Sequence, residues 1–567
     1  MRYLSAKVYR QVAFTAACLL LLATGCSLDR QAWRSPACVA PVDLSSQQAL
    51  IGGLHAAESY YAQAFALEQS GQAECVDYYY QAAVAAWPSF CVGQAGDASR
   101  EWQLYHSAVT RMLEAAQHHQ RWRPGQGLLV AGPAGLTPVP AAYHGFAWKS
   151  AEFSEMAPVG EYDVPELKYR FRTSGLGVPL VVVRRGPCIE PFMQREQSFA
   201  ATAVLRPTNV SRGSAPQFTL EFYNPVATDS LQTATGCTPL ARDLSAMFAY
   251  PPRGEDKLWL KDFLLPGSGT TDGGLYMLEP YQPGKIPVVL VHGLLSDSAT
   301  WVNMVNELRA NRDIADRYQF WAFQYSTGTQ FFLSAATLRQ ELRRLRTTYD
   351  PHRADPAMSQ MVMVGHSMGG LVTKLQVTYS GEHLWNTLAS RPPSQIVTTP
   401  QVRDRLTEQM FFDPNPGITR VVFIGTPHQG STDATRCIGR IGSVLAEQSP
   451  EAKQEHAQLV RDNPGVFAAE VQRKILSSID LMEPENPFLR TMLALPFSQQ
   501  VRVHSICGVV PRLCSAEPTD SVVPLSSARL ACVCSEALVP AKHTELTRDE
   551  QTIHEVARIL RLHAQCR

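Results

Sequence analysis

The stretch that decides the fold of this chain reads MVMVGHSMGG and runs from residue 361 to residue 370. Its first four residues are apolar and predict a buried strand. Ser367 then lies between Gly365 and Gly369, in Gly-x-Ser-x-Gly spacing. A strand that turns sharply into a helix holds such a serine on the tip of the turn, where only glycine-sized neighbours fit. The spacing therefore predicts a serine hydroxyl that projects into a cleft above the N-terminus of a helix.

Strands and helices alternate on both sides of this stretch. Apolar runs predict strands at residues 286–291, 318–325, 361–364, 420–424 and 501–506, and helices are predicted at 301–311, 333–348 and 552–564. This alternation indicates the α/β class, with a doubly wound, mostly parallel sheet. Further runs between residues 127 and 281 predict extra N-terminal strands, which we expect to extend that sheet on its N-terminal side.

A serine hydroxyl is a weak nucleophile and needs a base to take its proton. On this type of sheet the chain order is nucleophile, acid, histidine. We predict that the base is His543, which follows a short apolar run and precedes the last helix. His428 comes before the predicted acid, and His504 lies within a predicted strand. His554 and His563 have the spacing of solvated helix residues.

The predicted acid is Asp520, which follows a strand and precedes an apolar turn. That position places a carboxylate at the C-terminal edge of the sheet. The alternatives are Asp433, Asp480 and Glu517, of which Asp480 lies in a helical stretch and is expected to cap it or face solvent.

Backbone amides are expected to form an oxyanion hole. One is the amide of Met368, directly after the nucleophile. The second is expected in the loop after residues 286–291, where Gly293 lets the backbone approach the substrate and Leu294 supplies the amide. In that loop His292 is expected to shape the backbone rather than to act as a base.

These motifs together resemble a bacterial α/β-hydrolase of the lipase and esterase type. The residues that carry the resemblance are Leu290–Gly293, Gly365–Gly370, the Thr-Pro-His-x-Gly-Ser segment within Gly425–Ser431, Asp520 and His543. The resemblance covers about residues 280–565 and departs from the family at Ser521, where glycine often follows the acid. Two stretches, at about 377–419 and 432–497, are longer than a bare connection in the sheet needs, and the second is predicted to be mainly helical. The resemblance implies that they form a cap over the serine, and an apolar cap implies a substrate with a hydrophobic acyl group. The alternative is simple helical padding.

The first 26 residues resemble a bacterial lipoprotein signal peptide. Arg2, Lys7 and Arg10 form a positive n-region, and a short apolar stretch follows. Small residues then precede Cys26, which we expect to carry a fatty acyl chain such as palmitate. The alternative is an ordinary cleaved signal with an incidental cysteine. By resemblance, Ser27 favours a lipid anchor at the outer membrane of the cell envelope.

Residues 27–45 are predicted to form a tether, and residues 46–122 a helical segment that resembles a tetratricopeptide unit. The helical segment is expected to pack on the enzyme, and the alternative is a groove for a protein partner. The predicted hydrolase domain covers residues 123–567.

Composition excludes some functions. Lys plus Arg and Asp plus Glu both number 51, which gives no reason to expect nucleic acid as a partner. Cys507, Cys514, Cys532 and Cys534 predict at least one disulfide. Cys532 and Cys534 are too close in sequence for a usual zinc knuckle. The chemistry of a serine, a histidine and an acid needs no metal and no organic cofactor, so we expect neither.

The sequence therefore predicts a serine hydrolase that cleaves carboxylic esters through an acyl-enzyme on Ser367. Two alternatives use the same features. An acyltransferase would pass the acyl group to an alcohol instead of water, and a lipid-anchored scaffold would recruit a partner without catalysis.

Overall fold

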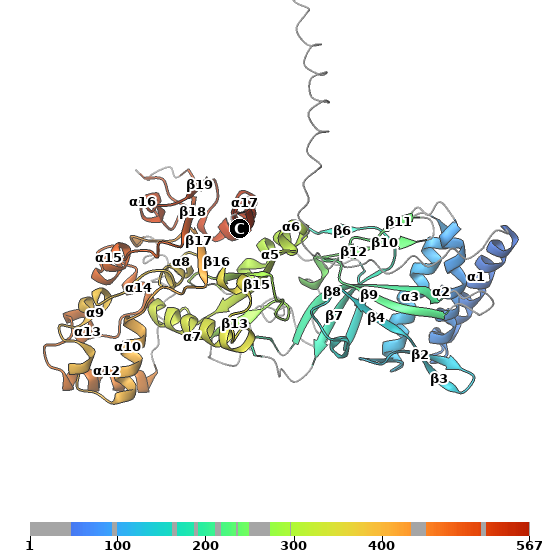
Figure 1. The fold of residues 1–567 in the computed structure, drawn as a ribbon, viewed down its shortest axis with the longest axis horizontal. Helices are drawn as coiled ribbons and strands as arrows, with labels where there is room; N and C mark the ends of the chain where they lie inside the picture. Colours follow the sequence, from blue (N-terminus) through green and yellow to red (C-terminus); the bar gives the residue numbers. More distant parts are fainter. Residues whose placement is uncertain are drawn as a thin grey trace, which may run out of the picture.

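The computed structural model describes residues 47–92, 99–160, 167–185, 191–194, 196–209, 217–233, 236–248, 273–294, 296, 298–432, 449–511 and 517–565. Within these, the C-terminal half is organised around a seven-stranded sheet in the order β13-β15-β14-β16-β17-β18-β19 (Figure 1). Its strands are β13 (Gly274–Met277), β14 (Ile286–Val291), β15 (Tyr318–Gln324), β16 (Met361–His366), β17 (Ile418–Ile424), β18 (Arg502–Gly508) and β19 (Ser535–Val539). Every neighbouring pair is parallel except β13 with β15. The predicted α/β-hydrolase fold is confirmed.

Helices cover both faces of this sheet because successive side chains of a strand point to opposite sides. The covering helices are α5 (Val302–Ala310), α6 (Arg312–Ala315), α7 (Phe331–Tyr349), α8 (Met368–Lys374), α16 (Leu525–Ala528) and α17 (Glu550–Gln565). Val288 and Leu290 of β14 pack in the apolar cluster that contains α5 and α17. Val289 and Val291 pack in the cluster that contains α7 and α8. Alternation along one buried strand thus builds a three-layer core.

A second unit precedes this sheet along the chain, on the right of Figure 1. It contains α1 (Gln47–Gln69), α2 (Cys75–Val92), α3 (Arg100–His118) and a five-stranded sheet in the order β4-β9-β8-β7-β5. These strands are β4 (Ala141–His144), β5 (Glu155–Pro158), β7 (Val178–Arg185), β8 (Glu196–Asn209) and β9 (Gln217–Tyr223). The remaining strands of this unit are β1 (Trp122–Arg123), β2 (Gly127–Gly132), β3 (Gly135–Val139), β6 (Arg172–Thr173), β10 (Ser230–Thr233), β11 (Gly236–Pro239) and β12 (Arg242–Asp243).

The expectation that the early strands extend the parallel sheet is therefore wrong for all of them but β13. The long strand β8 pairs on both sides within the five-stranded sheet, with β7 and with β9, so the seven-stranded sheet ends at β13. The helices pack on this second sheet, where the Tyr105 hydroxyl donates to the Leu205 carbonyl over 2.7 Å. The likeness of the helices to a tetratricopeptide unit stays a prediction.

Two helical segments flank β17 along the chain. The first contains α9 (His383–Leu388) and α10 (Pro400–Met410), and the second contains α12 (Pro450–Asp462), α13 (Ala469–Arg473), α14 (Ser478–Leu481) and α15 (Pro487–Ala494). They join each other through backbone bonds from Ala468 to Leu388 over 2.8 Å and from Ser390 to Val466 over 2.9 Å. We name them together the insertion module. That it forms a cap over Ser367 remains a prediction, and residues 433–448 lie outside the described residues.

The predicted lipidation site Cys26 also lies outside the described residues. In the described part of the chain, no helix has both the length and the apolar composition needed to cross a bilayer. Cys507, Cys532 and Cys534 are free thiols, so the predicted disulfide is wrong for these three. Cys507 lies buried in β18, and the two others are exposed next to β19. Cys514 is outside the described residues.

Candidate active site

Ser367 lies on the turn between β16 and α8. Its backbone has φ 54° and ψ −127°, a region that residues with a side chain rarely adopt. The Ser367 amide donates to the Ile424 carbonyl of β17 over 2.9 Å, which fixes the turn to the neighbouring strand. The serine is partly exposed, whereas its neighbours in β16 and α8 are buried. The strained turn therefore presents one hydroxyl at the C-terminal edge of the sheet.

Glycine is required on both sides of this turn. A methyl group on Gly365 would lie 2.7 Å from the Gly369 carbonyl oxygen and 2.7 Å from the Gly370 Cα. A methyl group on Gly369 would collide with the backbone of Val291 and His292 at the end of β14. The predicted lack of space around the serine is confirmed.

The structure brings the three predicted catalytic residues together. The Ser367 Oγ lies 2.8 Å from His543 Nε2, and His543 Nδ1 lies 2.6 Å from Asp520 Oδ2. His543 begins the short helix η6 (His543–Arg548), and Asp520 lies in the loop after β18. Because a carboxylate only accepts, Nδ1 carries the imidazole proton and Nε2 is free to accept the serine proton. His543 and Asp520 are both buried.

Both carboxylate oxygens of Asp520 are held. Oδ1 accepts the amides of Val522 over 2.9 Å and Val523 over 2.6 Å, while Oδ2 faces His543. The Asp520 carbonyl also accepts the His543 amide over 2.8 Å, so the acid contacts the histidine twice. Ser521 has φ 83°, a conformation that favours glycine.

The alternative acids that the structure describes have other hydrogen-bond partners. Asp480 caps α14 by accepting the Ser477 amide over 2.7 Å and pairs with Lys474. Glu517 accepts the Ser526 amide over 2.8 Å. Asp433 lies outside the described residues.

Gly425, directly after β17, makes room for the acid and the base. It has φ 54°, and a methyl group there would lie 3.2 Å from Asp520 Oδ2, 3.3 Å from His543 Nδ1 and 2.8 Å from a Leu546 methyl. The backbone at Gly425 therefore lies against the Asp520–His543 hydrogen bond. Sequence reasoning identified the Gly425–Ser431 segment only through resemblance. The contact that explains its first glycine is visible only in three dimensions.

The loop after β14 lies against the serine. A methyl group on Gly293 would lie 2.9 Å from Ser367 Cβ, so only glycine permits this approach. Met368 is the first residue of α8, and Leu294 follows Gly293. Both predicted oxyanion amides thus belong to segments that flank the serine, and their role remains a prediction.

His292 shapes this loop and is not placed as a base. It is fully buried and stacks on Tyr325. Its Nε2 accepts the Tyr325 amide over 3.3 Å, while the Tyr325 hydroxyl donates to the His292 carbonyl over 2.7 Å. Burial lowers the pKa of His292 to about 4, so the ring stays neutral near pH 7. Sequence reasoning missed Tyr325, because nothing in the predicted strand at residues 318–325 distinguishes it from its aromatic neighbours.

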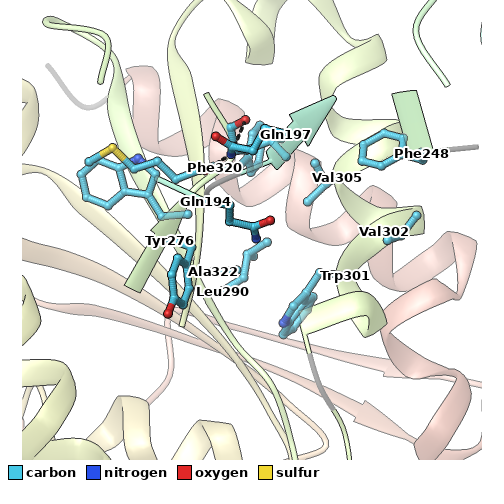
Figure 2. A pocket seen from close by; sticks show the side chains of 13 residues that line it. Gln194, Gln197, Phe248, Tyr276, Leu290, Trp301, Val302, Val305, Phe320 and Ala322 are labelled. Atoms are coloured by element: carbon cyan, nitrogen blue, oxygen red, sulfur yellow. Dashed lines mark hydrogen bonds between the residues drawn. The ribbon is translucent and has the colours of Figure 1, made fainter. Parts of the chain in front are cut away.

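A cavity elsewhere in the molecule is too small for a substrate. It lies where the second unit meets β13, β15 and α5, and its walls include Gln197, Leu290, Trp301 and Phe320 (Figure 2). Its volume of about 20 Å³ fits about one water molecule. The buried side chains of Gln194, Gln197, Trp301 and Trp321 each keep a polar atom without a hydrogen-bond partner, which suits water. Neither Ser367 nor His543 lines it.

Comparison with known proteins supports a hydrolase at a general level. Residues 284–459 match the model of the family described as "Putative serine esterase (DUF676)". This range contains Ser367 but neither Asp520 nor His543. No curated protein sequence matches the chain.

Several solved structures are similar to about half of this chain. Lipase BlEst2 from Bacillus licheniformis in its mature form is 14% identical over 50% of this chain and 97% of that chain, with a TM-score of 0.31. EstA from Clostridium botulinum is 13% identical over 52% and 89%, with a TM-score of 0.30. Phospholipase PlaB from Legionella pneumophila is 10% identical over 49% and 60%, with a TM-score of 0.32. These likenesses are too distant to indicate a substrate. The protein has an α/β-hydrolase fold, and part of its chain matches a serine esterase family.

Proposed function

We propose that this protein hydrolyses carboxylic esters through an acyl-enzyme on Ser367. The observation that supports this most is the continuous chain of hydrogen bonds from the partly exposed Ser367 through His543 to the buried Asp520. Serine, histidine and carboxylate in this contact order are the parts that acyl transfer to a hydroxyl nucleophile needs.

In the first half of the reaction, His543 Nε2 takes the Ser367 proton as Oγ attacks the ester carbonyl carbon. The carbonyl oxygen becomes an oxyanion, to which the amides of Met368 and Leu294 would donate. The imidazolium then gives its proton to the leaving alcohol oxygen as the carbon–oxygen bond breaks. Asp520 keeps the Nδ1 proton in place and stabilises the positive ring.

In the second half, water attacks the acyl-enzyme carbonyl and His543 takes a proton from that water. Collapse of the tetrahedral intermediate breaks the bond to Oγ, and His543 returns the proton to Ser367. An alcohol in place of this water would give acyl transfer. The intact chain of hydrogen bonds from Ser367 through His543 to Asp520 supports catalysis over a scaffold role.

The test is a Ser367→Ala variant assayed with p-nitrophenyl esters. Loss of the nucleophile is expected to lower kcat by about 10⁶-fold, as in other serine hydrolases. A fluorophosphonate probe should label the wild type at Ser367 and leave the variant unlabelled. Turnover that survives this substitution would refute the proposal. Acyl chains of increasing length then test the predicted preference for a hydrophobic acyl group.

We also propose that a lipid on Cys26 anchors the enzyme at the cell envelope. Only the sequence of residues 1–26 supports this. The full-length chain should partition into the detergent phase of Triton X-114, and Cys26→Ala should move it to the aqueous phase. Equal partitioning of the two proteins would contradict the anchor.

A further inference from the structure

We propose that His366, the residue before the nucleophile, is a positioning residue that holds His543 in place through its backbone carbonyl. The inference rests on the proposed function, because it concerns the same serine and histidine. His366 ends β16, so the residue directly before the nucleophile would also hold the base in position.

The contact between the two histidines is direct. His366 Nε2 lies 3.1 Å from the His543 carbonyl oxygen, and the ring centroids are 4.9 Å apart. A carbonyl oxygen only accepts, so Nε2 of His366 carries the proton and donates it to this bond. His366 is 6% exposed, which keeps water from competing for the carbonyl.

This bond complements those that Asp520 makes. Asp520 holds the His543 amide over 2.8 Å and the His543 Nδ1 over 2.6 Å. His366 holds the carbonyl at the other end of the same residue. His543 is therefore braced on both sides of its Cα, which limits rotation of the imidazole away from Ser367.

The other edge of the His366 ring faces the loop after β14. A methyl group on Gly293 would lie 3.1 Å from His366 Nδ1 and 2.9 Å from Ser367 Cβ. The His366 ring thus lies between two parts of the site, the Gly293 loop and the His543 helix, and keeps them apart on either side of the serine.

A purely structural role explains the imidazole poorly. His366 Nδ1 is buried and has no hydrogen-bond partner, which is unfavourable compared with an apolar side chain of similar size. The bond that this ring does make is the one to His543. Burial, and then the neighbouring His543, lower the pKa of His366 to about 3, so it neither takes the serine proton nor repels a charged His543 near pH 7.

The test compares His366→Leu with His366→Gln. Leucine removes the donor, whereas the glutamine amide nitrogen can donate from the position of Nε2. We expect His366→Leu to lower kcat by about 10- to 30-fold, the effect of one lost buried hydrogen bond, with little change in KM. His366→Gln should recover most of kcat, and all forms should share one pH profile. Rates are divided by the fraction of sites that a fluorophosphonate labels, so misfolded protein does not count. If His366→Leu does not fold, His366→Phe keeps a ring without a donor and should show the same loss.

A double substitution separates positioning from simple stability. If His366 acts through His543, its leucine variant should lose less than about threefold in an Asp520→Asn background, where the histidine is already misplaced. Unchanged kcat in His366→Leu, equal losses in the leucine and glutamine variants, or an undiminished loss in the Asp520→Asn background would each overturn the inference. The proposed function fails separately, if Ser367→Ala or His543→Gln keeps its turnover.

Discussion

Buried histidines lie at both ends of the parallel sheet, but their partners differ. At the C-terminal end His543 lies between the Asp520 carboxylate and the Ser367 hydroxyl. At the other end the Arg420 guanidinium donates to His504 Nε2 over 2.6 Å and to His563 Nδ1 over 3.0 Å. The same side chain type therefore serves two purposes in one sheet.

The charge of the partner decides whether a histidine serves as a base or as part of a structural network. A carboxylate on Nδ1 leaves Nε2 free to accept a proton and stabilises the ring once it is charged. A guanidinium occupies the lone pair that a base would use and opposes a second positive charge. Burial, followed by Arg420, lowers the pKa of His504 to about 4. His504 and His563 are thus acceptors in a structural network.

The largest effect is expected from a matched pair of substitutions that tests this contrast between the two ends of the sheet. His543→Gln should lower kcat/KM for a p-nitrophenyl ester by about 10⁴-fold or more, because glutamine cannot take the serine proton. His504→Gln should leave kcat within about twofold, since this ring lies at the other end of the sheet. A comparable loss in both variants would erase the distinction between the two ends.

A second pair tests the space behind the acid and the base. Gly425→Ala should lower kcat by about 10- to 100-fold, because the methyl group displaces the Asp520–His543 hydrogen bond. Gly465→Ala is the control, since Gly465 also has a positive φ of 71° but has no atom within 4 Å of the new methyl group. It should cost about 1 kcal/mol of stability through backbone strain alone and leave kcat unchanged. Equal kcat values for the two variants would show that glycine at residue 425 relieves backbone strain and that the contacts of an added methyl group do not matter.

The buried neutral histidines also predict a pH dependence of folding. The pKa values of His292 and His504 fall to about 4 in the folded protein, below the usual value near 6.5. Between pH 6.5 and 4 the unfolded chain therefore binds protons that the folded chain does not, and the free energy of unfolding decreases as pH falls. Each such histidine should cost about 2 kcal/mol at pH 5. Urea unfolding at pH 7 and pH 5 measures this, and His504→Gln should reduce the difference. A difference that His504→Gln leaves intact would exclude that residue as a source.

The smallest expected effect concerns Ser521 beside the acid. Ser521→Gly relieves a residue at φ 83° but makes the unfolded chain more flexible, so the gain in stability should stay below about 1 kcal/mol. Thermal unfolding and the ester assay together check this, with kcat expected to stay constant. A marked loss of kcat would show that the serine side chain itself supports Asp520.

The sequence was informative where local spacing decides the geometry. The glycines around Ser367 and the strand–helix alternation predicted the turn and the parallel sheet, because both depend on residues close together in the chain. The order of Ser367, Asp520 and His543 then led to a set that the structure places in contact.

Long-range pairing was less predictable. His563 has the spacing of a solvated helix residue, but it is buried against Arg420, 143 residues earlier. His554 has similar spacing and is exposed as expected. The early strands were recognisable as strands, yet nothing in β8 indicates that it pairs with β7 and β9 rather than with the hydrolase sheet. Which strands pair is decided by contacts between distant segments, and these leave little trace in a single sequence.

The insertion module has a consequence for how such enzymes diversify. Its two halves lie on either side of β17 in the chain, yet the backbone near α9 bonds to the backbone near α13. Neither half can be transplanted alone, because its partner amides and carbonyls would be left behind in the donor. Recombination between related enzymes should therefore exchange both halves together with β17, as one continuous segment of the chain.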